Sequence, residues 1–308
     1  MKISYVPYLL KDNFFKVEKR LFKIKSKNKY AHRIVLNIED GNDCLLNALK
    51  SGKPLLVTRY GANELNVTID SIIKDTISSR NMFRLCNNAG FFPQNEKYGD
   101  KFAKIMVESS RFVDFAALYY ASGEEYLLDT YAPNAILVNN RAIEPWYSTS
   151  NPWSAELKGK KVLVIHPFDN TIREQYKKRE LIFPNSDILP EFSLFTLKAV
   201  QTIAGQKDKR FNDWFEALDY MFEETKKIEY DVAILGCGAY GLPLAAKIKA
   251  SGKQAIHLGG ATQLLFGIKG TRWDEHPIIS KFYNSNWVRP SADDIPQNAY
   301  QVEKGCYW

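Results

Sequence analysis

The amino-acid sequence predicts an α/β fold in which a mostly parallel sheet carries helices on both faces. Short apolar runs alternate with helical patterns along the chain, which is typical of βαβ units. Residues 162–165 are apolar at consecutive positions, as expected for a strand that is covered on both faces. Near the other end of the chain, a glycine-containing turn joins a predicted strand to a predicted helix. Together these observations indicate a Rossmann-like architecture.

The expected elements follow in order from composition and periodicity. Apolar runs predict strands over 54–58, 113–119, 135–138, 161–166, 231–235 and 254–258. Helical spacing predicts helices over 62–73, 98–110, 123–130, 172–183, 194–204, 212–227 and 242–250. Pro167 ends the strand before it, because proline cannot donate to a strand ladder. Gly252 stands where a glycine commonly ends a helix.

The composition fits a globular protein rather than a fibrous, disordered or membrane-spanning one. Of 308 residues, 45% are hydrophobic and 25% are charged, and no apolar run reaches the roughly 18 residues of a spanning helix. We expect a basic arm over 1–34, a single α/β domain over 35–286 and a tail over 287–308 that packs on the domain. The N-terminus lacks a secretory pattern, and the four cysteines form no CxxC pair, so a cytoplasmic location is expected.

The positive charge of the chain is concentrated in the N-terminal arm. Residues 1–34 contain ten Lys or Arg and two acidic residues, a net charge of +8, whereas the whole chain carries +7. Apolar residues interleave with these charges, so the arm is expected either to contact an anionic membrane surface or to dock its apolar side on its own domain. A nucleic-acid partner is not expected, because the remaining residues supply no basic stripe.

The glycines Gly236, Gly238 and Gly241 form a GxGxxG pattern between a predicted strand and a predicted helix. Such a turn lets a phosphate approach backbone N–H groups at a helix N-terminus. The alternative is a turn that needs glycine only for close packing. A nicotinamide enzyme should also carry an acidic residue after the next strand, yet that strand ends in His257, Leu258 and Gly259. NAD is therefore not expected as a cofactor.

Two further segments offer groups suited to a phosphate or a sugar. The run 259–273, GGATQLLFGIKGTRW, contains the candidate ligand residues Gly259, Gly260, Gln263, Lys269 and Arg272. Lysine and arginine neutralise phosphate, and glycines leave backbone donors accessible. The run 59–64, RYGANE, follows a strand and contains a candidate diphosphate clamp, Arg59, with Gly61 and a candidate base or metal ligand, Glu64. The structural alternative for 259–273 is a helix that contributes to the core. The alternative for 59–64 is an ion pair at a surface turn that needs glycine.

Several candidates stand at the ends of predicted strands. His166 and His257 each end one, although a lone histidine is more often a structural residue. In an open parallel sheet, ligands bind outside the carboxyl ends of the strands. Arg59, His166, Gly236 and His257 are therefore expected to face one crevice. Because the sequence contains no HExxH, GxSxG or GxxxxGK[ST] motif, zinc peptidases, α/β-hydrolases and Walker ATPases are excluded.

The chain resembles GT-D-type glycosyltransferases in short motifs. RYGANE after the strand-forming LLVT resembles their RFGDGE-like motif, and residues 231–260 resemble their final βαβ unit. The HPF segment at 166–168 and LFGIKGTRW at 265–273 are similar to segments of proteins from bacterial surface-polysaccharide clusters. The resemblance implies a GT-D-like fold. It also implies transfer of a sugar from a nucleotide sugar, with a UDP-sugar as the expected donor, to a glycan or lipid-linked acceptor.

One departure from that family concerns metal binding. The acidic D-x-E pair that binds a divalent cation with the sugar diphosphate becomes Ala62-Asn63-Glu64, so only Glu64 remains. Hard cations such as Mg²⁺ or Mn²⁺ need oxygen ligands, and loss of one carboxylate weakens such a site. Either Glu64 holds the metal with acidic residues elsewhere, or fixed arginine and lysine cations stabilise the leaving diphosphate instead.

The leading hypothesis is a hexosyltransferase-type glycosyltransferase of surface polysaccharide or capsule biosynthesis, at the inner face of the plasma membrane. Glu64, His166 and His257 are the candidate catalytic groups, since neutral imidazole and carboxylate both suit base work. The expected nucleotide-sugar ligands are Arg59, Gly61, Gly236, Gly238, Gly241, Gly259, Gly260, Gln263, Lys269 and Arg272. The alternatives are an NAD(P)-dependent oxidoreductase and a non-catalytic sugar-nucleotide-binding protein.

Overall fold

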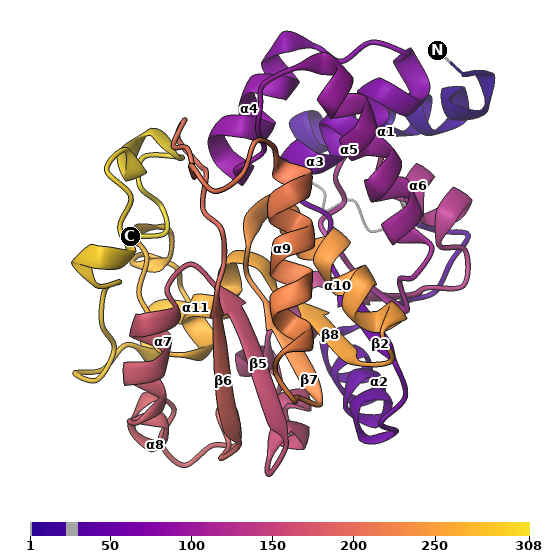
Figure 1. Cartoon of the computed structure of the whole chain (residues 1–308). Helices are drawn as coiled ribbons and strands as arrows, with labels where there is room; N and C mark the ends of the chain where they lie inside the picture. The colour runs from indigo at the N-terminus through magenta and orange to yellow at the C-terminus, as the bar shows by residue number, and fades with distance from the viewer. Residues whose placement is uncertain (1, 23–29) are drawn as a thin grey trace.

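The computed structural model (Figure 1) describes residues 2–22 and 30–308, and the side chains of residues 16–22 lie outside the description. Within this part of the chain an eight-stranded sheet has the order β1-β4-β3-β2-β8-β7-β5-β6, and every neighbouring pair is parallel. The predicted parallel α/β sheet is confirmed. The strands are β1 (Val35–Leu36), β2 (Leu55–Thr58), β3 (Phe115–Leu118), β4 (Ile136–Asn139), β5 (Lys161–His166), β6 (Ser193–Lys198), β7 (Val232–Leu235) and β8 (Gln254–His257).

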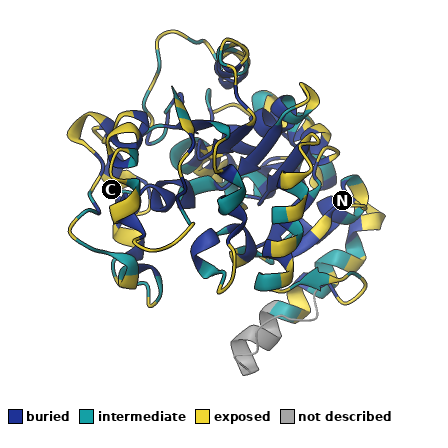
Figure 2. Ribbon diagram, turned by 90° about the horizontal axis from the view of Figure 1, so that it is seen from below, coloured by how far each residue is buried: buried dark blue, intermediate teal, exposed yellow. Residues whose placement is uncertain are grey.

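Helices cover both faces of the sheet, as predicted (Figures 1 and 2). Along β5, Val162 and Val164 enter one hydrophobic core, and Leu163 and Ile165 enter the other. Consecutive apolar residues therefore serve two layers, because successive strand side chains point to opposite faces. One layer contains α3 (Ala62–Ile69), α4 (Ser79–Ala89), α5 (Glu96–Ser110), α6 (Glu124–Tyr131), α9 (Trp214–Lys226) and α10 (Gly241–Ala250), and the other contains α2 (Ile38–Lys50), α7 (Asp169–Tyr176), α8 (Arg179–Ile182) and α11 (Thr262–Leu265).

The helix predicted over 194–204 is wrong, because this segment begins as the edge strand β6. All six residues of β6 pair with β5 in parallel register, from Lys161↔Ser193 to His166↔Lys198. The apolar residues here fit either period, and pairing with β5 decides between them. The helix predicted over 172–183 is divided into α7 and α8, and that over 62–73 becomes a π-helical turn after Ile69. The helices α2 and α4 were not predicted.

The centre of the sheet is where its two halves meet. Strand β2, from the first half, lies beside β8, from the second, with Val57 opposite Ile256. At the last residues of these two strands, the Thr58 hydroxyl and His257 Nδ1 form a hydrogen bond of 2.9 Å. Because all the strands are parallel, their carboxyl ends share this edge, so loops distant in sequence are brought together there.

The two terminal segments both contact the sheet-centred domain. Tyr5, in the turn before α1 (Val6–Phe22), and Tyr30 are buried in the core. Residues 23–29 of the predicted arm, including four of its lysines, lie outside the described residues. In the predicted tail, Trp287 and Val302 are buried. No helix in the described part of the chain is both long enough and apolar enough to cross a membrane.

Candidate functional site

A cavity of about 640 Å³ lies over the carboxyl edge of the sheet. Its lining comes from the loops that follow β2, β3, β4, β5, β6, β7 and β8, together with the end of α4 and the last residues of the tail. This position is the one at which open parallel sheets bind ligands. The volume lies within the roughly 300–1,000 Å³ that is usual for small-molecule sites.

The cavity brings together most of the predicted site residues. Those among its lining are Arg59, Gly61, Glu64, His166, Gly236, Gly238, His257, Gly259, Gly260, Gln263 and Arg272. Gly241 and Lys269 are not among the residues that line it. The Lys269 ammonium instead lies 5.0 Å from the centre of the Tyr283 ring. The structure thus gives Lys269 no direct place at this site.

The glycines of the GxGxxG turn permit close packing. A Cβ at Gly236 would lie 2.7 Å from the Gly259 carbonyl oxygen. Gly238 has a φ of +57°, and a Cβ there would lie 2.7 Å from the Ala89 carbonyl oxygen. At Gly241 a Cβ would overlap the imidazole of His257. Gly236 and Gly238 also line the cavity, so for these two the packing role and a phosphate-binding role are compatible.

The Arg59 side chain is buried and held in place by acceptors from two directions. Its guanidinium donates to a Glu144 carboxylate oxygen at 2.8 Å and to the Leu258 carbonyl, and it reaches the Asn140 side chain at 3.5 Å. The Tyr119 ring centre lies 5.5 Å from the guanidinium carbon. Arginine has five N–H donors, and these contacts use three. Arg59 is therefore fixed in orientation and retains donors for an additional anion.

Arg272 is held by the tail, which sequence analysis did not place at the site. Its guanidinium pairs with Glu303 and donates to the Tyr307 hydroxyl at 3.3 Å. The Tyr307 ring also packs against Gly260, where a Cβ would lie 2.5 Å from a ring carbon. Glu303, Tyr307 and Trp308 all line the cavity. The aromatic pair Tyr307 and Trp308 was the sequence feature that could have indicated a role for the tail at the cavity. Glu144, the partner of Arg59, stands in no motif and could not have been found in this way.

Glu64 differs from the other two cavity-lining glutamates, because no arginine contact is found for it among the described residues. It occupies the first turn of α3, which begins after Gly61, and its carboxylate lies against that glycine. Burial raises the pKa of the Glu64 carboxyl, its own backbone N–H opposes the shift, and the negative charge of Glu303 adds to it. Such a carboxylate holds a proton more readily than a solvated one.

Both cavity-lining histidines are neutral at physiological pH. Burial lowers the pKa of His166 to about 3, although the charge of Asp294 opposes the shift. Burial also lowers the pKa of His257 to about 3, and the positive charge of Arg59 adds to this effect. The Phe168 backbone N–H donates to Nδ1 of His166 at 3.0 Å, so the proton of this neutral ring is on Nε2. His166 is therefore a hydrogen-bond donor rather than a base.

Gln263 serves chiefly to hold neighbouring chain segments together. Its amide nitrogen donates to the carbonyl oxygens of Ile268, Lys269 and Tyr307 at 3.0–3.3 Å. The amide oxygen is buried and has no hydrogen-bond partner among the described residues. Because its contacts join the segment after α11 to the tail, Gln263 supports one wall of the cavity.

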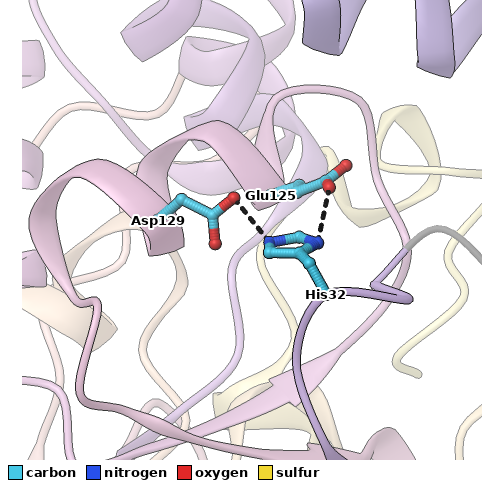
Figure 3. A group of neighbouring side chains, drawn as sticks. All are labelled: His32, Glu125 and Asp129. Carbon is cyan, nitrogen blue, oxygen red and sulfur yellow. Dashed lines mark hydrogen bonds and ion pairs between the residues drawn. The ribbon is translucent and has the colours of Figure 1, made fainter.

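The cavity residues do not fit a divalent cation held by the protein alone. Among the described residues, one group of three potential ligands meets at suitable spacing, namely His32, Glu125 and Asp129 (Figure 3), and none of them lines the cavity. Lys11 and Arg33 already pair with these carboxylates. At the cavity, Glu64 belongs to no such group among the described residues, so it would supply a single carboxylate to a cation that arrives with a diphosphate.

The fold and the cavity define an α/β protein with an open cavity at the carboxyl edge of a parallel sheet. No family model matches the chain, and no curated protein matches it. A solved structure of the highly conserved domain of unknown function 1792, described as having a distinct glycosyltransferase fold, is 16% identical. The match covers 80% of this chain and 81% of that chain, with a TM-score of 0.40. A selenomethionine-substituted structure of the same domain is also 16% identical, covers 80% and 82% of the two chains and has a TM-score of 0.41.

Proposed function

We propose that this chain is a hexosyltransferase-type glycosyltransferase that moves a sugar from a nucleotide sugar, with UDP-sugars the first class to test. The acceptor would be a hydroxyl group of a glycan or a lipid-linked sugar in surface-polysaccharide biosynthesis. One observation carries the proposal: Arg59, Glu64 and Arg272 line one cavity together with two glycine-containing turns. That set combines cations for a diphosphate with a carboxylate for an acceptor proton.

The two arginines would stabilise the leaving group. As the bond between the sugar carbon and the diphosphate oxygen breaks, negative charge accumulates on the diphosphate, and fixed guanidinium groups stabilise that charge. Each guanidinium now contacts a carboxylate, Glu144 for Arg59 and Glu303 for Arg272. Diphosphate oxygens would compete with these carboxylates. The Nε2–H of His166 supplies a further donor at the same cavity.

Glu64 is the best-placed base for the acceptor. Its raised pKa brings the carboxylate nearer to the basicity that proton removal near neutral pH requires. The histidines suit this task less well, because a pKa of about 3 makes each a weak base. The proposal therefore assigns proton removal to Glu64 and hydrogen-bond donation to His166. The rings of Tyr119, Trp273 and Trp308 line the same cavity and offer stacking surfaces for a base or a sugar.

The test combines ligand binding with turnover. A thermal-shift panel of UDP, UDP-sugars and NAD(P), with Mn²⁺ or with EDTA, identifies the ligand class. Release of UDP from the stabilising sugar then measures turnover in the wild type and in Glu64→Gln. We expect the variant to lose at least about 100-fold in rate while still binding UDP, because a general base contributes about 10²–10⁴-fold. Glu229→Gln changes an exposed glutamate that is not among the cavity-lining residues, so it is the matched control and should retain full activity.

Three results would contradict the proposal. Stabilisation by NAD(P) but not by UDP compounds would favour an oxidoreductase. Binding of UDP-sugars by the wild type without turnover would indicate a non-catalytic binding protein. Full activity in Glu64→Gln would remove Glu64 from the mechanism.

A further inference from the structure

Helix α1 is attached to the domain through one polar face. The Asp12 carboxylate is buried and accepts a hydrogen bond from the Ser122 hydroxyl at 2.6 Å and another from the Gly123 backbone N–H at 3.3 Å. One helical turn earlier, the Tyr8 hydroxyl donates to the Asp129 carboxylate at 3.2 Å. These contacts hold α1 against α6 and the turn before it, so the side of α1 that faces the domain is defined.

The chain that follows α1 returns to the same support. His32 contacts the carboxylates of Asp129 at 2.9 Å and Glu125 at 3.6 Å (Figure 3). Arg33 pairs with Asp129 at 3.4 Å, and Lys11 of α1 pairs with Glu125. Helix α6 thus binds the described N-terminal segment at two places along the chain. Because both places are fixed, the outer side of α1 keeps a constant orientation.

That outer side is apolar and exposed. Leu10 and Phe14 on α1 are 65% and 61% exposed, and Ile3 in the preceding turn is 88% exposed. Pro7 is exposed as well, and positions 7, 10 and 14 share one helix face. Asp12 and Tyr8, which bind α6, lie on the opposite side. Several exposed apolar side chains on one helix face indicate an interaction site, whereas single exposed apolar residues are ordinary.

We propose that this outer face of α1, formed by Ile3, Pro7, Leu10 and Phe14, docks on an anionic lipid membrane surface. The positive charge of the N-terminal segment favours an anionic membrane over a second copy of the chain. Residues 1–34 carry a net charge of +8, which attracts an anionic bilayer and repels a second copy of the same segment. Interfacial helices of this type insert apolar side chains among the headgroups while basic residues bind anionic lipids. The inference concerns a surface separate from the cavity and does not depend on the proposed reaction.

The experiment is co-flotation of the full-length chain with vesicles. Phosphatidylcholine vesicles containing phosphatidylglycerol should bind the wild type, and phosphatidylcholine alone should bind it much more weakly. Raising the salt concentration should weaken binding, because salt screens charge attraction. The triple variant with Ile3, Leu10 and Phe14 each changed to Ser should bind at least about 30-fold more weakly, since it loses most of the apolar contact.

Two further variants make the result specific. Changing Lys16, Lys19 and Arg20 to Gln should weaken binding to anionic vesicles by about 100-fold while leaving the apolar face intact. The matched control changes Phe83 and Leu181, each 53% exposed on other elements, to Ser and should bind like the wild type. Circular dichroism should show the same helix content for all three variants.

The proposal is overturned if the wild type does not bind anionic vesicles, or if the Ile3, Leu10 and Phe14 variant binds them as tightly as the wild type. It is also overturned if the wild type is a dimer that this variant converts to a monomer while neither binds vesicles, because the apolar face would then join two copies. Vesicle binding is measured without turnover. Failure of the glycosyltransferase assay and failure of this proposal are therefore distinguishable.

Discussion

The buried histidines predict a definite loss of stability in mild acid. Burial lowers the pKa of His166 and His257 from 6.5 to about 3. Between these values the unfolded chain binds protons that the folded chain excludes, so stability is complete above about pH 6.5 and falls as the pH decreases toward 3. Each histidine contributes a slope of up to about 1.4 kcal/mol per pH unit. From pH 6.5 to pH 5, the two together should lower the free energy of unfolding by about 3 kcal/mol, because the slope reaches its full value only below pH 6.5.

The perturbation that isolates this effect is His166→Asn. The asparagine side-chain oxygen can accept the hydrogen bond from the Phe168 backbone N–H that Nδ1 accepts now, but the side chain does not titrate. Urea unfolding followed by tryptophan fluorescence between about pH 7 and pH 5 gives the free energy of unfolding. In the variant, the number of protons taken up on unfolding should fall by close to one. About half of the histidine contribution to the pH dependence of the unfolding free energy should therefore remain.

A matched control separates titration from simple destabilisation. Leu127→Ala removes a fully buried, non-titrating side chain of the hydrophobic core and should cost about 2–5 kcal/mol at every pH, with the slope unchanged. If His166→Asn and the wild type have equal slopes, His166 is not held neutral by burial. The low pKa that excludes His166 as a base would then be wrong, because an imidazole with an ordinary pKa suits proton removal near neutral pH.

Two other substitutions test the packing and charge of the site. Gly241→Ala should lower the free energy of unfolding by about 1–3 kcal/mol in urea titrations, because the added methyl must displace the His257 ring from its contact with Thr58. Unchanged stability would show that the ring has room to move. Glu144→Gln should raise the affinity for UDP by about tenfold in calorimetric titrations, because Arg59 loses its charged partner to a neutral one. Weaker binding would show instead that Glu144 is needed to hold Arg59 in position.

The sequence predicted the central strands and the edge of the sheet at which the cavity lies. Runs such as 162–165 and 232–235 are apolar at every position, so burial on both faces was readable without coordinates. The residues after these runs, including His166 and Gly236, meet at one edge because the strands are parallel. Strand β6 could not be predicted in the same way, since its half-exposed apolar residues acquire their period only by pairing with β5.

The organisation of the cavity depended on contacts that no local pattern encodes. Glu144 and Glu303 follow no motif, yet each binds a guanidinium group from a distant segment. The role of His166 required its environment, because only the Phe168 backbone N–H identifies the nitrogen that bears the proton. Gly241 likewise fits the phosphate-binding pattern in the sequence, but the structure shows it making room for His257.

The N-terminal segment and the cavity share one support, which connects the two proposals structurally. Glu124 of α6 is fully buried and accepts hydrogen bonds from the Tyr30 hydroxyl at 3.0 Å and from the Tyr119 backbone N–H at 3.1 Å. Tyr119 in turn lines the cavity and lies against the Arg59 guanidinium. Because neighbouring residues of α6 bind α1 and His32, a membrane contact at α1 would act on the element that positions this wall. A lipid-linked acceptor held in that membrane would then meet a cavity of fixed orientation.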